Sequence, residues 1–437
     1  MSRTFHSLRY FNFRLWFFGN IIASTGMWMQ RVAQDWLVLT VLTQNSGTQV
    51  GVVTALQFLP ILVLSPWAGL LADRLNRRAL LQAMQLAHAL LGLILGVLIL
   101  TNTAQLWHVY VLALLGGVAG AIDSPARQAF VSELVPPVSL SNAVGLNSTA
   151  FNAARLIGPA VSGLLIDAIG TGWVMIVTAV AFFAPVLTLA LMRSADLVPR
   201  KVVKRSPGQI REGVSYVKNR PDIVLILVIV AVVSGLGMNF QLTSALMATE
   251  VYGKAAGEYG ILGSFMAVGA LGGSLLAARR AQPRLRLIVS GAAIYGLLEI
   301  VLALAPTYES FAVLAVPTGL AMLTMVTAAN ATIQITTDET VRGRVMALYS
   351  MIFLGATPIG SPFIGWVGEQ FGARWSILVG GGASLAVGVI AGVWGLIHWN
   401  YRVKFHVSAH PIEVEGPAER AYVAALVAEA ERNATGK

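Results

Sequence analysis

Long apolar segments follow one another along almost the whole chain, and this feature constrains the fold more than any other. Between about residues 14 and 400, apolar runs of about 20 to 30 residues alternate with short polar connections. A helix of about 20 apolar residues is long enough to cross the hydrocarbon core of a bilayer. Only 11% of the 437 residues are charged, whereas a soluble domain carries about 25% charged residues. The sequence therefore predicts an all-α membrane protein.

Twelve of these runs are predicted as transmembrane helices. A transmembrane β-barrel is not indicated, because its strands would show alternating hydrophobicity over about ten residues. The N-terminal segment MSRTFHSLRYFNFR leads into the first run without a small-residue cleavage site, so we expect the first helix to remain in the mature protein. The predicted spans are 15–43, 47–72, 79–101, 105–126, 141–169, 173–192, 222–249, 257–278, 285–305, 309–336, 343–368 and 374–399.

The basic residues lie mostly in alternate connections between the predicted spans. Eight lysines and arginines fall between Arg193 and Arg220, whereas the connections on the other side hold only Lys254 and Arg374. Cytoplasmic loops of membrane proteins are enriched in Lys and Arg. We therefore expect a multi-pass protein of the cell membrane with both termini in the cytoplasm. The net charge of +10 then reflects topology, and nucleic acid is not expected as a partner.

Residue types that bind metals or nucleotides are sparse. The chain has no cysteine, and its six histidines show no ligand spacing such as HExxH. A GxxxxGK[ST] loop is absent, which excludes an ATP-driven pump for this chain alone. We expect no cofactor and no metal. His88 fits a packed polar residue better than an intramembrane titrating group.

A polar connection at residues 193–221 divides the predicted spans into two sets of six. We predict an N-terminal half at 1–192, a C-terminal half at 222–400 and a cytoplasmic tail at 401–437. Within the connection, SPGQIREGVSYVKNRP predicts a short amphipathic helix on the membrane surface. Within the tail, the Ala- and Glu-rich residues 418–432 predict a helix between loose flanks.

Two similar segments indicate that the six-helix unit is duplicated. LIGPAVSGLLIDAIGTGW at 156–173 and PIGSPFIGWVGEQFGARW at 358–375 align without gaps, share several glycines and place Asp167 opposite Glu369. The match falls in the fifth and eleventh predicted spans, where a six-plus-six repeat puts it. Transporters built from two parallel halves bind substrate between the halves near mid-membrane. The sequence therefore predicts two pseudo-symmetric halves with a substrate site between them.

The junction between the second and third spans reads GLLADRLNRR. It resembles the G-x-x-x-D-R-x-G-R-R loop of the major facilitator superfamily. Asn76 replaces the second glycine, and Asn tolerates left-handed backbone geometry better than most residues. The resemblance implies the major facilitator fold and a cytoplasmic gate. The residues of this implied gate are Gly69, Asp73, Arg74, Arg77, Arg78 and Asp123.

In that family the loop closes the cytoplasmic side in the outward-open state. The resemblance implies that Asp73 faces the start of the helix near Arg342, where a carboxylate meets the positive end of the helix dipole. It also implies an acid on the fourth helix, and Asp123 is the expected partner of Arg74 or Arg77. A simpler interpretation is that these charges only mark the membrane interface.

The fifth span contains Gly158, Pro159 and Gly163 in the segment NAARLIGPAVSGLL. This pattern resembles the G-P-x-x-G-G signature of the exporter branch of the same superfamily, with Ser162 in place of one glycine. The resemblance extends from residue 8 to about 400, and phrases such as FNFRLWFFGN are similar to the subgroup that contains the enterobactin exporter. It implies antiport, although helix packing also explains the glycines.

Charged residues within the predicted spans are the strongest candidates for function. Such residues are energetically expensive in a membrane and usually face a bundle interior or a water-filled cavity. Asp35, one turn after Arg31 on the first span, is the expected proton-coupling carboxylate, and a permanent structural pair of these two residues is the alternative. Arg155 in the fifth span is expected to bind the anionic part of a substrate or to pair with Asp35. Glu299 in the ninth span is the second candidate for proton coupling.

Several uncharged polar residues within the spans are expected to contact substrate, with bonding between helices as the alternative. These residues are Gln34, Gln57, Asn147, Asn239, Gln241, Asn330 and Gln334.

The predicted function is secondary active transport, with proton-coupled efflux of amphiphilic or drug-like small molecules by alternating access. The expected partners are a small-molecule substrate, protons and membrane lipid, and the chain is expected to be a monomer. An importer of a small metabolite with the same fold is the alternative. A channel is less favoured because no selectivity filter is visible, and an intramembrane enzyme because no nucleophile and base motif is found.

Overall fold

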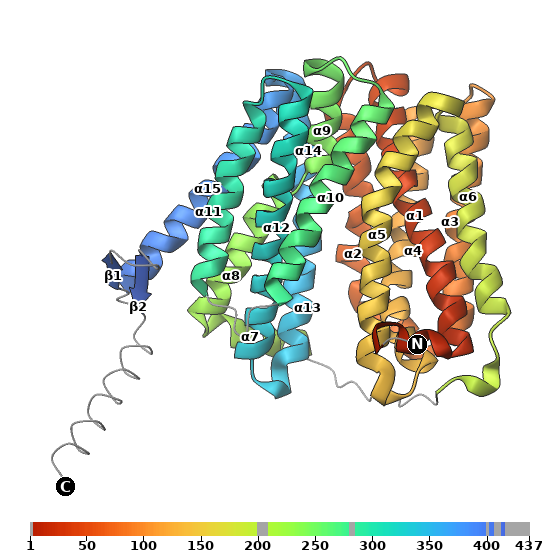
Figure 1. Ribbon diagram of the computed structural model, residues 1–437, viewed down its shortest axis with the longest axis horizontal. Coiled ribbons are helices and arrows are strands. Elements are labelled where there is room, and N and C mark those ends of the chain that lie inside the picture. The colour runs from red at the N-terminus through yellow and green to blue at the C-terminus, as the bar shows by residue number, and fades with distance from the viewer. Residues whose placement is uncertain (1–2, 199–208, 279–284, 399–401, 406–411, 416–437) are drawn as a thin grey trace, which may run out of the picture.

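The computed structural model describes residues 3–198, 209–278, 285–398, 402–405 and 412–415. Helices make up almost all of this described part (Figure 1). The α-helices are α1 (Phe11–Trp36), α2 (Gly47–Arg74), α3 (Arg77–Leu100), α4 (Leu106–Leu134), α5 (Pro137–Ile169), α6 (Thr171–Ala190), α7 (Gln209–Lys218), α8 (Pro221–Val232), α9 (Phe240–Leu246), α10 (Ala256–Ala278), α11 (Leu285–Ala303), α12 (Tyr308–Thr336), α13 (Glu339–Gly355), α14 (Thr357–Phe371) and α15 (Ala373–His398). Short 3-10 or π-helices are η1 (Arg3–Arg9), η2 (Leu37–Leu42), η3 (Ser194–Asp196), η4 (Val233–Gly237) and η5 (Met247–Val251).

Eleven helical segments of the described part are long and apolar enough to span a membrane. Two of them contain breaks, because Pro221–Val251 combines α8 with α9 and Glu339–Phe371 combines α13 with α14. The first predicted span, which is now α1 with η2, is not among the eleven. Its polar residues, including Asn20, Gln34 and Asp35, lower its hydropathy, yet α1 packs lengthwise on α5 and α6. The all-α membrane fold predicted from the sequence is confirmed.

The helices form two groups that stand side by side in Figure 1. In the N-terminal group, α1 packs on α5 and α6, α2 on α4, and α3 on α4 and α6. In the C-terminal group, α10 packs on α12, while α11 packs on α12 and α15. The groups meet mainly where α5 crosses α10 and where α2 crosses α14. We call the end with the N-terminus and residues 75–76 the proximal end, and the end with residues 43–46 and 252–255 the distal end.

The seventh predicted span is broken at η4, and side chains satisfy the carbonyl groups that the break releases. The Tyr295 hydroxyl donates to the Gly237 carbonyl at 3.0 Å, and Asn239 Nδ2 donates to the Gly235 carbonyl at 2.8 Å. A broken helix persists inside a membrane protein when neighbouring groups satisfy its backbone in this way. The break therefore belongs to the packed interior, and it turns α9 toward the space between the two groups.

Outside the spans, the structure agrees with the sequence in one place and differs in another. Helix α7 lies within the connection where a short amphipathic helix is predicted, and its Val217 is buried. The predicted start of that helix at Ser206 lies outside the described residues. The flank at 410–417, predicted to be loose, contains β2 (Ile412–Glu415), which pairs antiparallel with β1 (Arg402–Phe405). The helix predicted at 418–432 also lies outside the described residues.

Candidate functional site

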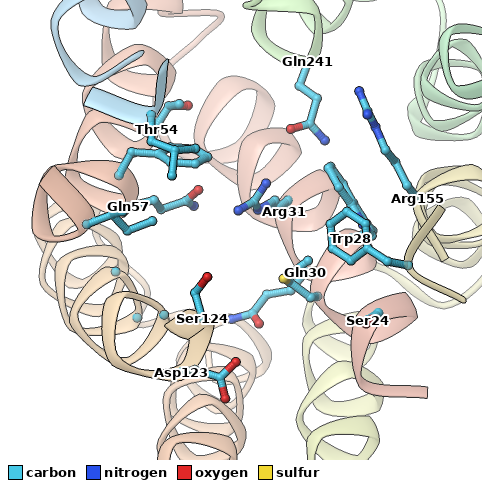
Figure 2. A pocket seen from close by; sticks show the side chains of 18 of the residues that line it. Ser24, Trp28, Gln30, Arg31, Thr54, Gln57, Asp123, Ser124, Arg155 and Gln241 are labelled. Carbon is cyan, nitrogen blue, oxygen red and sulfur yellow. The ribbon is translucent and has the colours of Figure 1, made fainter. Parts of the chain in front are cut away.

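A cavity of about 770 Å³ lies between the two groups of helices. Helices α1 to α6 form one wall, and residues 234–242 with residues of α10, α12, α13 and α14 form the other. Figure 2 shows that polar side chains such as Arg31, Gln57, Ser124 and Gln241 point into this space from several helices. A cavity of this size between helical bundles is large enough for a drug-sized molecule.

The distal end of the cavity is closed where glycines let helices of opposite groups touch. A Cβ atom at Gly163 would overlap the Ala256 carbonyl oxygen, and one at Gly260 would overlap the Pro159 carbonyl oxygen, so α5 and α10 are in backbone contact. At the other crossing, a Cβ atom at Gly365 would overlap the Gly47 carbonyl oxygen. Small residues allow such close helix approach. We call the two crossings the α5–α10 seam and the α2–α14 seam.

Each seam also carries a carboxylate at the start of a helix of the opposite group. Glu369 Oε2 accepts hydrogen bonds from Ser46 Oγ at 2.7 Å and from the Thr48 backbone N–H at 3.1 Å. Asp167 Oδ2 accepts from the Gly257 backbone N–H at 2.8 Å. A carboxylate is favourable beside the free N–H groups and positive dipole at a helix N-terminus. The two acids that coincide in the internal repeat therefore hold equivalent positions.

The proximal end of the cavity is open. Ser124, Gln128 and Ser148 line the cavity on α4 and α5, and all three are exposed. A Cβ atom at Gly145 would meet nothing within 4 Å, in contrast to the glycines of the two seams. The two groups of helices also diverge toward this end in Figure 1. The structure therefore represents a state that is sealed distally and accessible proximally.

Two arginines of the cavity wall lie on either side of one tryptophan. The Arg31 guanidinium carbon lies 5.1 Å from the Trp28 ring centroid and 5.1 Å from the Phe58 ring centroid. The Arg155 guanidinium carbon lies 5.6 Å from the Trp28 ring centroid. Neither arginine has a carboxylate oxygen within 4.0 Å in the described part of the chain. The alternative in which Asp35 forms an ion pair with one of these arginines is therefore not seen in the described part of the chain, although Asp35 and Arg31 attract each other through space.

Asp35 is directed away from the cavity, toward the opposite group of helices. It is buried, it does not line the cavity, and the Tyr259 hydroxyl of α10 donates to its Oδ2 at 3.5 Å. The neighbouring Trp36 stacks on the Tyr259 ring at a centroid distance of 5.9 Å. Arg31 instead turns toward the rings of Trp28 and Phe58, which explains why the two charges on one helix face do not pair. Asp35 thus lies beside the α5–α10 seam.

A second polar cluster lies deeper toward the proximal end and centres on Asp123. Arg127 Nε donates to Asp123 Oδ2 at 2.8 Å, and Gln85 Nε2 donates to Asp123 Oδ1 at 2.9 Å. Arg127 also donates to Asn20 Oδ1 on α1. The expectation that Asp123 pairs with Arg74 or Arg77 is wrong here. The physical reason is that α4 continues past the predicted end at residue 126, so Asp123 faces the cavity rather than the helix end.

The GLLADRLNRR segment has different partners from those implied by the resemblance. Arg77 donates to Glu133 Oε1 at 2.7 Å, and Arg78 donates to the Ala190 carbonyl at 2.9 Å. Asn76 has φ −66°, so it is not left-handed, and its side chain caps α3 by accepting from the backbone N–H of Arg78 at 3.0 Å. Arg74 is exposed.

The remaining gate expectations concern the end that is open in this structure. Gly69 lies within α2, and the Asp73 side chain lies outside the described part. On α13, a Cβ atom at Gly343 would meet nothing within 4 Å.

The fifth-span glycine motif has a clear packing role. A Cβ atom at Gly158 would lie 2.6 Å from the Trp28 Cβ, and the Ser162 hydroxyl donates to the Met29 carbonyl at 2.8 Å. Gly158 therefore sets the distance between α5 and α1, while Pro159 and Gly163 face α10 across the seam. These contacts favour the packing interpretation of the glycines, and they place the motif at the distal seal.

Five of the seven uncharged polar candidates line the cavity. Gln57 Nε2 donates to Gln34 Oε1 at 3.1 Å, and the Asn147 side chain accepts from Asn20 Nδ2 at 2.9 Å. Asn239 bonds to its own helix break, whereas Gln241 points into the cavity (Figure 2). The other two, Asn330 and Gln334, were expected to contact substrate. They lie outside the cavity wall and bond to each other at 2.6 Å on α12.

Glu299 lies away from the cavity, between α11 and α15. It is buried, and its Oε1 lies 2.7 Å from the Tyr295 hydroxyl oxygen, within hydrogen-bond distance. Its Oε2 has no hydrogen-bond partner among the described residues, and a Cβ atom at Gly381 on α15 would lie 2.8 Å from the Glu299 Cβ. Because Tyr295 also bonds to the carbonyl of Gly237, Glu299 belongs to the group of side chains that supports the break in the seventh span.

The sequence alone did not single out several residues that the structure brings to the site. Trp28 and Tyr259 are aromatic residues in apolar runs, so nothing distinguished them from packing residues. Arg127 directly follows the predicted fourth span at 105–126, so its position in the sequence indicates a cytoplasmic connection rather than a cavity wall. Asn20 and Gln85 are polar residues within apolar spans, and this is the signal that would have found them.

Comparison with known proteins identifies the family of the chain. The family model described as "Transmembrane secretion effector" matches residues 2–415. The multidrug efflux pump Tap of Mycolicibacterium fortuitum is 27% identical over 386 residues, which cover 86% of this chain and 93% of Tap. The staphyloferrin A transporter of Staphylococcus aureus is 25% identical over 260 residues, or 59% of this chain and 64% of that protein. The latter match thus spans less than two thirds of the relative's length.

A solved structure supports the fold. A bacterial homolog of the human lysosomal transporter Spinster superposes with a TM-score of 0.66 at 14% identity, covering 88% of this chain and 95% of that chain. At this identity the likeness concerns the fold alone.

Proposed function

Because this chain belongs to the transmembrane secretion effector family of major facilitator transporters, which are not enzymes, we propose that it exports small amphiphilic molecules in exchange for protons. The observation that carries this proposal is the cavity between the two groups of helices, sealed distally and open proximally. Alternating access requires a site between two such groups that opens to one side at a time. The multidrug efflux pump Tap, matched over almost its whole length, favours export.

The distribution of basic residues supports the orientation that export requires. Lys and Arg concentrate in the connections at the proximal end, so the positive-inside rule puts that end, with both chain termini, in the cytoplasm of a cell-membrane protein. The structure then corresponds to an inward-open state, which takes up cargo from the cytoplasm. Opening of the distal end would release the cargo outside.

Asp35 is the group that we assign to proton coupling. It is buried on α1, and its described hydrogen-bond partner Tyr259 belongs to the opposite group of helices. Separation of α1 from α10 at the distal end would break this bond and admit water to the carboxylate. The proton affinity of a carboxyl group depends on its hydration and on its hydrogen bonds. Proton exchange at Asp35 is therefore tied to opening of the seal.

The test is transport in proteoliposomes of known orientation, with one anionic and one cationic dye and an imposed pH gradient. The parent chain should move dye against the direction of proton flow. Asp35→Asn should remove the response to the gradient, while Glu309→Gln, an exposed acid at the distal end, should retain it. Monodispersity after purification and thermal stability establish that each variant is folded.

The outcomes separate the competing functions. Movement of dye in the same direction as protons would contradict export and indicate import. A folded Asp35→Asn variant with a normal gradient response would refute the assignment of Asp35 and make Glu299 the next carboxylate to test. Dye flux that does not respond to any gradient would contradict proton coupling altogether.

A further inference from the structure

The charges on the cavity wall are unbalanced. Three arginines and one aspartate are found among the described residues that line the cavity. Arg127 pairs with Asp123, so Arg31 and Arg155 are left without an acidic partner in the described part. A guanidinium group stays protonated in proteins, so burial does not neutralise these side chains. Two permanent positive charges therefore face the space that receives the cargo.

Within the part of the chain that the structure describes, no side chain accepts a hydrogen bond from either arginine. Trp28 and Phe58 present ring faces, which attract a cation but accept no conventional hydrogen bond. The Trp28 Nε1 atom is itself buried, and no acceptor for it is found in the described ranges. Arg31, Arg155 and Trp28 thus form a cluster of donors on one wall. Figure 2 shows the side chains of Arg31 and Arg155 extending into the cavity near Trp28.

Asp35 forms no ion pair with Arg31 in the described part of the chain, although the two charges attract each other through space. It is the nearest acid to Arg31 along α1, but it lies more than 4.0 Å from the guanidinium nitrogens and outside the cavity wall. Its described hydrogen-bond partner is Tyr259. Under the proposed function Asp35 also takes up a proton during the cycle, which would remove its charge while Arg31 keeps its own.

The opposite wall of the cavity has a different character. The C-terminal group contributes mainly apolar and adaptable side chains, together with a few amides. Methionine and phenylalanine contact apolar and aromatic bodies of varied shape. The apolar residues of this wall are Met238, Phe240, Leu242, Met266, Met322, Phe353 and Leu354.

We propose that the cargo is an organic anion with an apolar or aromatic body, and that Arg31 and Arg155 bind its carboxylate or a similar oxyanion. This inference rests on the proposed transport function and names its substrate class. An arginine binds a carboxylate through two parallel N–H···O bonds, which an ammonium group cannot reproduce. Two arginines without a partner inside a membrane are costly, and an anionic cargo supplies the charge that they lack. The apolar wall then holds the body of the same molecule.

The test uses two dyes that share a xanthene ring and differ in charge, anionic fluorescein and cationic rhodamine 123. Fluorescence anisotropy measures their binding to the purified full-length chain in phosphatidylcholine nanodiscs without any pH gradient. The parent should bind fluorescein at least about tenfold more tightly than rhodamine 123. Equal binding of both dyes, or tighter binding of rhodamine 123, would overturn the inference without use of any variant.

Variants then assign the preference to the two arginines. Arg31→Gln and Arg155→Gln should each weaken fluorescein binding about tenfold and leave rhodamine 123 binding unchanged or stronger. Arg155→Lys keeps the charge but loses the paired N–H donors, so its affinity for fluorescein should lie between that of the parent and that of Arg155→Gln. Lys254→Gln, which removes a cation at the distal end outside the cavity, is the matched control. Folded arginine variants that retain the full preference for fluorescein would contradict the assignment.

This binding assay separates the inference from the proposed function. Binding requires neither protons nor a direction of transport, so an anion preference without gradient-driven flux would refute the proposed export and leave the binding site in place. Gradient-driven export of rhodamine 123 with no binding or transport of fluorescein would support the proposed export and refute the anion-binding site.

Discussion

The two seams that close the distal end are built alike but differ in one respect. Each joins a helix of the repeated segment, α5 or α14, to a helix of the opposite group, and each has a carboxylate at the start of that partner helix. Only the α5–α10 seam adjoins a buried carboxylate, Asp35, that bonds to a side chain of the opposite group in the described part. The duplicated part of each seam explains closure, and the unduplicated part is where the proton coupling that we propose would act on closure.

The largest effect is expected when backbone contact at one seam is prevented. In Gly163→Leu the added side chain overlaps the Ala256 carbonyl, so α5 and α10 must separate and the distal seal opens. The chain has no cysteine, so spin labels on Thr103→Cys and Glu309→Cys report the distal separation without background labelling. The distance distribution should shift to longer values, and cargo export should fall at least about tenfold.

Two variants test whether this effect belongs to the seams. Gly365→Leu should act in the same way through the α2–α14 seam. There the Gly47 carbonyl faces Gly365 as the Ala256 carbonyl faces Gly163 in the other seam. Gly382→Leu is the control, since a Cβ atom there would meet nothing within 4 Å. A distal separation in Gly163→Leu that equals that of the control would show that backbone contact does not hold the seal.

A smaller and more selective effect is expected from Tyr259→Phe. This change removes the hydroxyl that donates to Asp35 and keeps the ring that stacks on Trp36. A hydrogen bond to a charged group contributes about 1.5–3 kcal/mol, and the 3.5 Å length puts this one at the low end. The midpoint of the pH profile of transport should therefore move by about one unit, while dye affinity at fixed pH stays the same.

Tyr308→Phe is the matched control for this measurement. Its hydroxyl donates to the backbone carbonyl of Glu258 at 2.9 Å, at the same distal level but with no contact to Asp35. Its pH profile should coincide with that of the parent. If Tyr259→Phe and Tyr308→Phe shifted the profile equally, the asymmetry between the seams would not be linked to proton coupling.

The sequence predicted the helices well because the length and hydropathy of each run depend on local residues alone. It predicted the site less well because side-chain partners depend on other helices. Arg31 and Asp35 share a helix face, yet Arg31 lies over the Phe58 ring and Asp35 accepts a hydrogen bond from Tyr259. Asp123 was assigned to the helix end because the apolar run weakens near residue 126, whereas α4 continues to Leu134.

The smallest expected effect comes from the two carboxylates that the seams share. Asp167→Asn and Glu369→Gln keep the size of the side chain but remove the negative charge beside a helix N-terminus. Both residues are exposed, so screening by solvent limits each contribution to about 0.5 kcal/mol, or about a twofold change in the open population. The sites are separate, so the double variant should show about the product of the two changes.

Spin-label distances at low and high salt measure the open population directly. Equal small effects that decrease with salt indicate that the two carboxylates stabilise the closed distal end equally. A much larger effect of Asp167→Asn would mean that the α5–α10 seam controls opening through Asp167 as well as through Asp35.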